Sequence, residues 1–368
     1  DLHYPLRRQR QMCIRDSCFL ARAQVNFLFL WTTTAAACPN NPTCHLPISA
    51  ALLSTAPAAA RSRRPASSPF VEAMTASLTN IDSIRTNHPT FWTQLKNGTF
   101  FKLAPRIAVR RDHYHSLDFP SQLRLRAIAA ARSAYTAVLI SKSAARVHDL
   151  WVIPTTKEKI ELALPTNTLP RKDRRGPERI YRKAALPDPV LVDGARCVSK
   201  ARAVIDVTRY HGFNDGLIAA DSALRAGVSK EDLTQEFARM GRVRNSRTVR
   251  AVIHHASELS RSSYESLARA LIIQADFPWP MFFEAQHNAL PGIVTALCIN
   301  NAYAIDIVST RRTSAQAMLY QRERHRRLQD AGYTVLSFAP RQLREHPERF
   351  ISEIIATISA RQSAARSG

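Results

Sequence analysis

The segment 262–338 constrains the fold most strongly, because its apolar pattern switches between the periods of helices and strands. Its first part carries apolar residues at 264, 267, 268, 271 and 272, which fall on one helical face. Gly332 is placed to end a second helix just before a strand. The segment therefore predicts a helix over 262–272, strands over 294–297 and 303–308, a basic helix over 320–328, and a strand over 333–338.

Two carboxylates stand out within this pattern: Glu265 on the first helix and Asp306 on a central strand. This order of elements resembles the restriction-endonuclease-like fold, and more closely the bacterial relatives of the very-short-patch-repair endonuclease. The resemblance covers residues 258–368 and implies metal-dependent phosphodiester cleavage, in which carboxylates hold Mg²⁺ and the metal activates a water. Glu265 and Asp306 match two of the family's four site positions and would be the catalytic and metal-binding pair.

The other two site positions of the family carry residues that cannot bind a metal ion well. Thr295 stands where the family has an acidic residue that opens the first strand, and Val308 stands where it has a further polar residue on the second strand. Ser309 replaces the glycine expected at the end of the strand. The resemblance therefore implies a degenerate site in which Gln286 or Glu284 would have to stand in for the missing groups.

Each of these residues also has a structural explanation. Ser262 and Glu265 have the spacing of a capping box at a helix start. Asp306 lies in an apolar strand, where an unpaired carboxylate is costly, so an ion pair with the basic helix 322–327 is an alternative to a metal. Gln286 would then be a scaffold residue. No cofactor is expected unless the nuclease is active, in which case it would be Mg²⁺.

The chain is strongly basic, with 52 Lys and Arg against 29 Asp and Glu and a net charge of +23. From Met74 onward, 44 cations stand against 26 acids, a net charge of +18. Such an excess favours a polyanionic partner such as DNA through phosphate neutralisation and counterion release. From Met74 onward only Cys197 and Cys298 occur, which excludes a disulfide framework or a zinc knuckle there.

Residues 1–73 have a different character from the rest. Residues 7–16 resemble a translated sequencing adapter, and no acidic residue occurs between 17 and 71. We expect this segment to be non-native or disordered, with Met74 as the true start. No apolar run approaches the length of a membrane span, so we expect a cytoplasmic protein without a membrane partner.

Residues 74–115 predict two helices, 78–87 and 89–96, followed by a basic hairpin over 99–111 that turns at Ala104–Arg106. Helices followed by a basic hairpin are typical of a winged helix-turn-helix. Residues 74–260 resemble the AbiEi-type antitoxins of type IV toxin–antitoxin systems. In such a domain the second helix enters the major groove and the hairpin contacts phosphates. The DNA-binding candidates are Thr93, Gln94 and Lys96 on the helix, and Lys102, Arg106, Arg110 and Arg111 on the hairpin. A solvated charged surface is the alternative.

Residues 116–257 predict a mixed α/β and helical connector. Ser141 or Ser143 is placed to cap a helix, Ile160–Leu164 alternates like a strand with one wet face, and 170–183 forms a basic loop that could contact phosphate. Ser199 and the pair Ser229 and Asp232 are placed to cap further helices.

The predicted architecture is α/β (α+β): a winged helix, a helical connector and an endonuclease-like domain. The function that we expect is a DNA-binding transcription regulator. The antitoxin resemblance implies a nucleotidyltransferase-like toxin as partner, and a homodimer is a further possibility. The alternatives are a metal-dependent DNA endonuclease and a protein-interaction module with fortuitous charge.

Overall fold

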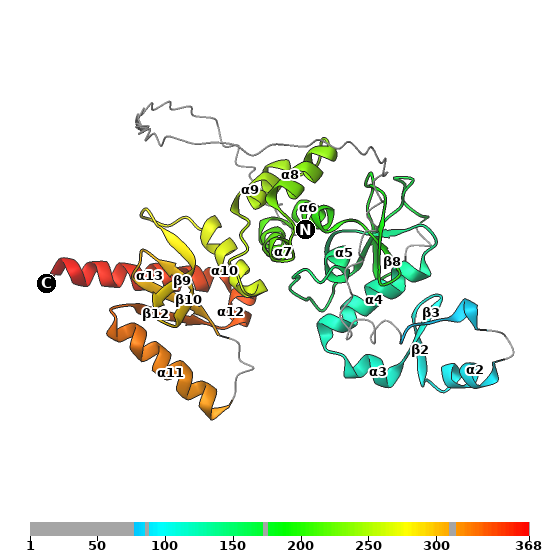
Figure 1. The fold of residues 1–368 in the computed structure, drawn as a ribbon, viewed down its shortest axis with the longest axis horizontal. Coiled ribbons are helices and arrows are strands. Elements are labelled where there is room, and N and C mark those ends of the chain that lie inside the picture. Colours follow the sequence, from blue (N-terminus) through cyan, green and yellow to red (C-terminus); the bar gives the residue numbers. More distant parts are fainter. Residues whose placement is uncertain (1–76, 85–87, 172–175, 309–313, 368) are drawn as a thin grey trace, which may run out of the picture. The chain divides into compact units, whose positions relative to one another are not determined.

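The structure is a computed structural model that describes residues 77–84, 88–171, 176–308 and 314–367. All of them belong to one compact unit, Arg64–Gly368. The predictions for residues 1–73, and the placement of Ser309, lie outside the described residues. Helices and strands alternate along the described chain (Figure 1), which confirms the mixed α and β class.

The N-terminal part contains a small antiparallel sheet of order β1-β3-β2. The hairpin predicted over 99–111 is confirmed, because Phe101 pairs with Val109 across its two strands. The elements are β1 (Thr79–Asn80), η1 (Ile81–Ser83), α2 (Pro89–Lys96), β2 (Phe100–Ala104) and β3 (Ile107–Arg110).

The helix predicted over 78–87 is wrong in the part that is described. Thr79 instead pairs with Ala108 on the open edge of β3, and Asn80 caps the short 3-10 helix by accepting a bond from the Asp82 N–H at 3.1 Å. The exposed strand edge supplies backbone partners that outweigh local helix propensity. Residues 85–87 lie outside the described structure.

The central part is a mixed sheet of order β6-β5-β4-β8-β7 packed against two helices. Its elements are α3 (Arg111–Ser116), α4 (Phe119–Ser133), β4 (Val138–Leu139), α5 (Ser141–Val147), β5 (Ile160–Ala163), β6 (Arg179–Tyr181), β7 (Val190–Val192) and β8 (Ala195–Cys197). Two predictions fail here. Neither serine caps α5, because Ile140 is the N-cap and the Ser143 hydroxyl accepts the Glu161 N–H at 2.9 Å. The solvent-exposed face predicted for strand β5 is also absent, since all four residues of β5 are buried.

Four helices follow, and the predicted caps of the first and third are confirmed. The Ser199 hydroxyl accepts the Arg202 N–H at 3.2 Å, and Ser229 and Asp232 form a reciprocal capping box. Gly212 ends the first of them with a φ of 91°, a conformation that favours glycine. The helices are α6 (Lys200–His211), α7 (Phe213–Arg225), α8 (Lys230–Arg239) and α9 (Ser246–His255).

The C-terminal part is a four-stranded sheet of order β12-β11-β10-β9, in which only the β11–β12 pair is parallel. Its elements are α10 (Ser263–Gln274), β9 (Phe283–Leu290), β10 (Ile293–Ile299), β11 (Tyr303–Ile307), α11 (Ala315–Asp330), β12 (Thr334–Phe338), α12 (Pro340–Glu345) and α13 (Pro347–Ser367). All five predicted elements of this part are confirmed in kind and order. The sequence pattern missed β9, whose residues are half-buried or exposed throughout and so show no clean alternation.

Different helices cover the two faces of this sheet (Figure 1). On one face, Leu297 and Ile305 pack with Leu267 of α10 and Phe350 of α13. On the other face, Ala304 packs against Leu328 of α11. Because neighbouring residues of a strand point to opposite faces, Asp306 shares the α11 face with Ala304. Among the described residues, no helix has both the length and the apolar character needed to cross a membrane.

Candidate functional site

Asp306 is held by an arginine of α11. Its side chain is only 8 % exposed, and both of its oxygens are bonded to the Arg324 guanidinium, with Nη2 at 2.9 Å from Oδ1 and Nη1 on Oδ2. Arg324 also donates to the Val294 carbonyl at 2.8 Å. His325 lies at the same carboxylate, with Nε2 3.8 Å from Oδ2. The ion pair expected with the basic helix 322–327 is therefore formed.

Glu265 has a different set of partners, at the start of α10. Its Oε2 accepts the Arg261 N–H at 2.8 Å and the Gln286 side-chain amide at 2.7 Å, while its own N–H bonds the Ser262 hydroxyl at 3.2 Å. The capping interaction is thus present, but it reaches the backbone of residue 261 instead of residue 262. Burial raises the pKa of the Glu265 carboxyl, and the bond from the Arg261 N–H opposes that rise.

The two carboxylates do not converge. Glu265 is on α10, which covers one face of the sheet, whereas Asp306 points to α11 on the other face. Gln286 donates through its side-chain amide to Glu265, not to Asp306. Its positive φ of 54° marks an irregular point in β9, which lets its side chain reach α10.

These residues do not fit a magnesium ion. Such an ion needs two or three acidic oxygens around one point, but both oxygens of Asp306 are bonded to a guanidinium. Glu284, the other stand-in considered from the sequence, is exposed and pairs with His287 at 2.8 Å. Thr295 is fully buried, and its hydroxyl has no hydrogen-bond partner among the described residues. Val308 contributes only its backbone N–H, which donates to the Phe338 carbonyl at 2.9 Å. Within the described ranges, no group of three His, Cys, Asp or Glu side chains is arranged to hold a metal.

The DNA-binding candidates of the N-terminal part are mostly exposed. Thr93, Gln94 and Lys96 on α2 and Lys102, Arg110 and Arg111 on the hairpin are all accessible to solvent. Arg110 pairs with the exposed Asp112 at 2.8 Å, and Arg111 donates to the Gly98 carbonyl at 2.9 Å. Such exposed contacts contribute little and exchange readily for a phosphate.

Arg106 differs from the other candidates. Its guanidinium donates twice to the Ser133 carbonyl, at 2.8 and 3.0 Å, pairs with Asp82 at 3.1 Å, and stacks 3.9 Å over the Tyr135 ring. These contacts fasten the hairpin turn to the end of α4. Arg106 is therefore an anchor of the fold whose charge is already engaged.

The register of the hairpin brings two of its exposed cations to the side of α2. Lys102 pairs with Ala108, and Arg110 pairs with Phe100, so both cations share the hairpin face that carries Phe100. Phe100 in turn packs on Phe91 of α2, with ring centroids 5.4 Å apart. The exposed cations of the hairpin and the exposed polar residues of α2 thus border one another.

Sequence reasoning missed two buried polar clusters. Glu161 on β5 accepts bonds from His211 and Arg182, each at 2.9 Å. Burial alone would raise the pKa of Glu161, but these donors outweigh it and lower the pKa to about 2. Asp221 on α7 is bonded to Ser266 at 2.7 Å and to Arg269 at 2.5 Å, and so ties α7 to α10. In the sequence, the signal for both is an acidic residue within an apolar pattern.

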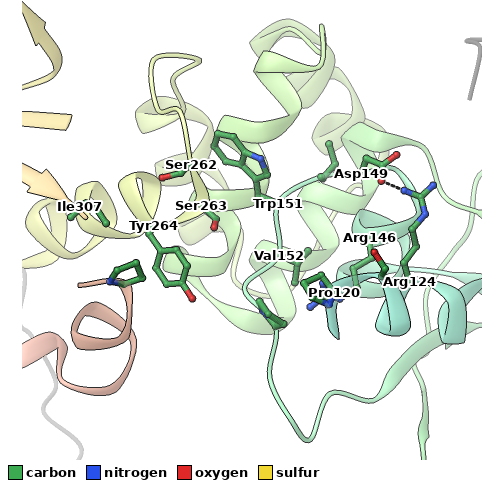
Figure 2. Close-up of a pocket in the computed structure, with 14 residues that line it drawn as sticks. Pro120, Arg124, Arg146, Asp149, Trp151, Val152, Ser262, Ser263, Tyr264 and Ile307 are labelled. Atoms are coloured by element: carbon green, nitrogen blue, oxygen red, sulfur yellow. Dashed lines mark ion pairs between the residues drawn. The ribbon is translucent and has the colours of Figure 1, made fainter. Parts of the chain in front are cut away.

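A recess of about 650 Å³ lies at the start of α10 (Figure 2). Trp151 and Tyr264 contribute apolar surface to it, and Arg124 and Arg146 contribute charge. Both arginines are already matched, because Arg124 pairs with Asp149 and with Asp193 and Arg146 makes a two-pronged pair with Glu158 at 2.6 Å. The recess therefore presents paired charge beside an aromatic wall.

No family model matches the chain, and neither a curated protein nor a solved structure matches it. The functional conclusion therefore rests on the contacts described above.

Proposed function

We propose that the protein is a DNA-binding regulator that uses α2 and the β2–β3 hairpin as a winged helix. The supporting observation is the shared surface formed by exposed Gln94 and Lys96 on α2 and by Lys102 and Arg110 on the hairpin face next to that helix. A helix presenting polar side chains beside a cationic hairpin can read a groove and hold phosphates at the same time. The net charge of +23 favours association with the same partner.

The resemblance to AbiEi-type antitoxins indicates which kind of regulator this would be. It implies repression of the protein's own operon and neutralisation of a nucleotidyltransferase-like toxin, with a homodimer as a further possibility. The C-terminal part would be an endonuclease-like domain whose catalytic centre has been replaced by the Asp306–Arg324 ion pair. Such a domain would serve as a binding or oligomerising platform.

A metal-dependent endonuclease is the second candidate. The observation in its favour is the half-buried pair of Glu265 and Gln286, where burial raises the pKa of the carboxyl as in many catalytic acids. This function would require Asp306 to leave Arg324 and to meet Glu265 from the other face of the sheet.

The test measures DNA retention and plasmid nicking by the full chain in the same samples, with Mg²⁺ or Mn²⁺ and with Asp306→Ala beside it. Retention that falls steeply with salt, without nicking, supports the regulator. Nicking that Asp306→Ala abolishes would establish the endonuclease instead. Absence of retention at low salt would leave a protein-interaction module as the better explanation.

A further inference from the structure

A second recess, of about 640 Å³, is lined by the loop 183–187, by α6, by the end of α8 with the turn that follows it, and by Asn167. Six of its lining residues are cations, whereas Glu236 is the only carboxylate among the described lining residues. The cations are Lys183, Arg202, Arg209, Arg239, Arg242 and Arg244. Lys183 is the last residue of the basic loop that the sequence singled out as a phosphate contact.

The inner wall of this recess balances its own charge. Arg202 lies 3.4 Å from both Asp206 and Glu236, and Arg209 lies 3.3 Å from Asp206. Arg202 also donates to the Ala185 carbonyl at 2.7 Å, which fixes the loop against α6. Buried Arg202 and partly buried Arg209 thus face two buried carboxylates, so these pairs join the walls of the recess and their charges balance.

The rim is different, because three of its four cations lack a partner among the described residues. Lys183, Arg242 and Arg244 are exposed and make no hydrogen bond or ion pair with any other described residue. Arg239 is 73 % exposed and reaches Glu236 only at 3.6 Å. Four positive charges around one opening repel one another, and an anion bound between them would relieve that repulsion.

The lining also indicates what kind of anion would fit. Leu186, Pro187, Met240 and Val243 give the recess an apolar portion beside the rim cations. Guanidinium groups bind phosphate oxygens in a two-pronged manner, and the volume lies within the range of small-molecule sites. A ligand with several phosphates and an uncharged ring matches both portions.

We propose that this recess binds a nucleotide carrying two or more phosphates, with the phosphates between Lys183, Arg239, Arg242 and Arg244 and the ring against the apolar portion. This site is separate from the winged-helix surface, so the proposal does not depend on DNA binding. The shared chemistry is phosphate recognition, and a nucleic-acid backbone is the other source of phosphate that the test must distinguish.

The test is calorimetric titration of the full chain with ATP, ADP, adenosine and inorganic phosphate. ATP and ADP should bind saturably, and adenosine should not bind measurably. Arg242→Gln with Arg244→Gln should weaken ATP binding about tenfold or more, because one charge-assisted hydrogen bond is enough for that factor. The matched control, Arg322→Gln with Arg327→Gln, removes two exposed cations of α11 and should leave ATP affinity unchanged.

Three outcomes would overturn the proposal. The first is the absence of saturable ATP and ADP binding, and the second is an equal loss in the control variant, which would mean diffuse attraction. In the third, the Arg242 and Arg244 variant loses affinity for a DNA duplex while no nucleotide binds, which would make the recess part of a nucleic-acid interface. Lys102→Gln with Arg110→Gln should leave ATP binding intact, so failure of the DNA-binding proposal can be recognised separately.

Discussion

Removing Arg324 should destabilise the protein more than removing Asp306, although both belong to one ion pair. In Arg324→Ala, the carboxylate stays on a central strand, 8 % exposed, with no guanidinium on its oxygens and with the His325 ring still 3.8 Å away. A strand residue cannot swing its short side chain into water. In Asp306→Ala, the long Arg324 side chain keeps its bond to the Val294 carbonyl and can extend toward solvent.

The structure sets the expected size of each effect. Leaving one buried partner of an ion pair uncompensated costs about 3–5 kcal/mol, so Arg324→Ala should lower the free energy of unfolding by roughly that amount. Asp306→Ala should cost about 1–3 kcal/mol, since the remaining cation finds solvent. The double variant should cost less than the sum of the two, by about 2 kcal/mol, because the second substitution removes the orphaned group.

Urea unfolding of the full chain, followed by fluorescence, measures these differences. Arg326→Ala is the matched control on the same helix, because Arg326 pairs with Glu323 at 2.7 Å while 62 % exposed. That substitution should cost at most about 1 kcal/mol. A neutral or stabilising Arg324→Ala would refute the reasoning, because it would mean that Asp306 does not depend on the guanidinium and remains available for another ligand such as a metal.

Three further outcomes are expected. If Lys96, Lys102, Arg110 and Arg111 each neutralise a phosphate, the affinity of the protein for DNA should fall about 150-fold between about 50 and 200 mM salt. In the double variant Lys102→Gln with Arg110→Gln, the same change in salt should lower the affinity only about 12-fold. Fluorescence anisotropy measures both slopes, and equal slopes would contradict these contacts. Thr295→Val should stabilise the protein by about 1 kcal/mol in thermal unfolding, because it removes a buried hydroxyl without a partner and keeps the shape; a loss of stability would show that the hydroxyl is bonded. The pKa of Glu161 is lowered to about 2 in the folded chain, so the ionised carboxylate contributes about 3 kcal/mol to the free energy of unfolding. This contribution is present above pH 4.5 and is lost as the pH falls toward 2. Glu161→Gln should therefore make stability less dependent on pH in the acid range, and an unchanged dependence would contradict this.

The sequence was sufficient wherever the determining interactions are local. Helix starts at Ser199 and Ser229 follow from side chains that bond N–H groups three residues away, and the hairpin over 99–111 follows from alternation and a turn. The element order of 262–338 followed in the same way from apolar periodicity.

Tertiary contacts decided what those patterns could not. Thr79 joins an open strand edge formed about 30 residues later, which overrides its helical surroundings. Glu161 is buried because His211 and Arg182 come from distant segments to bond it. Strand β9 shows no alternation because its side chains are half-buried or exposed along its whole length.

For the candidate site, too, the sequence determined one part and the tertiary structure the other. The sequence alone determined that Asp306, inside an apolar strand, needed a cation or a metal, because a buried carboxylate is too costly to leave unpaired. Only the tertiary structure decided between them: α11 brings Arg324 onto both oxygens, and α10 carries Glu265 to the other face of the sheet. Sequence spacing gives the order of acidic groups along the chain, but packing on the two faces of a sheet decides which of them can meet.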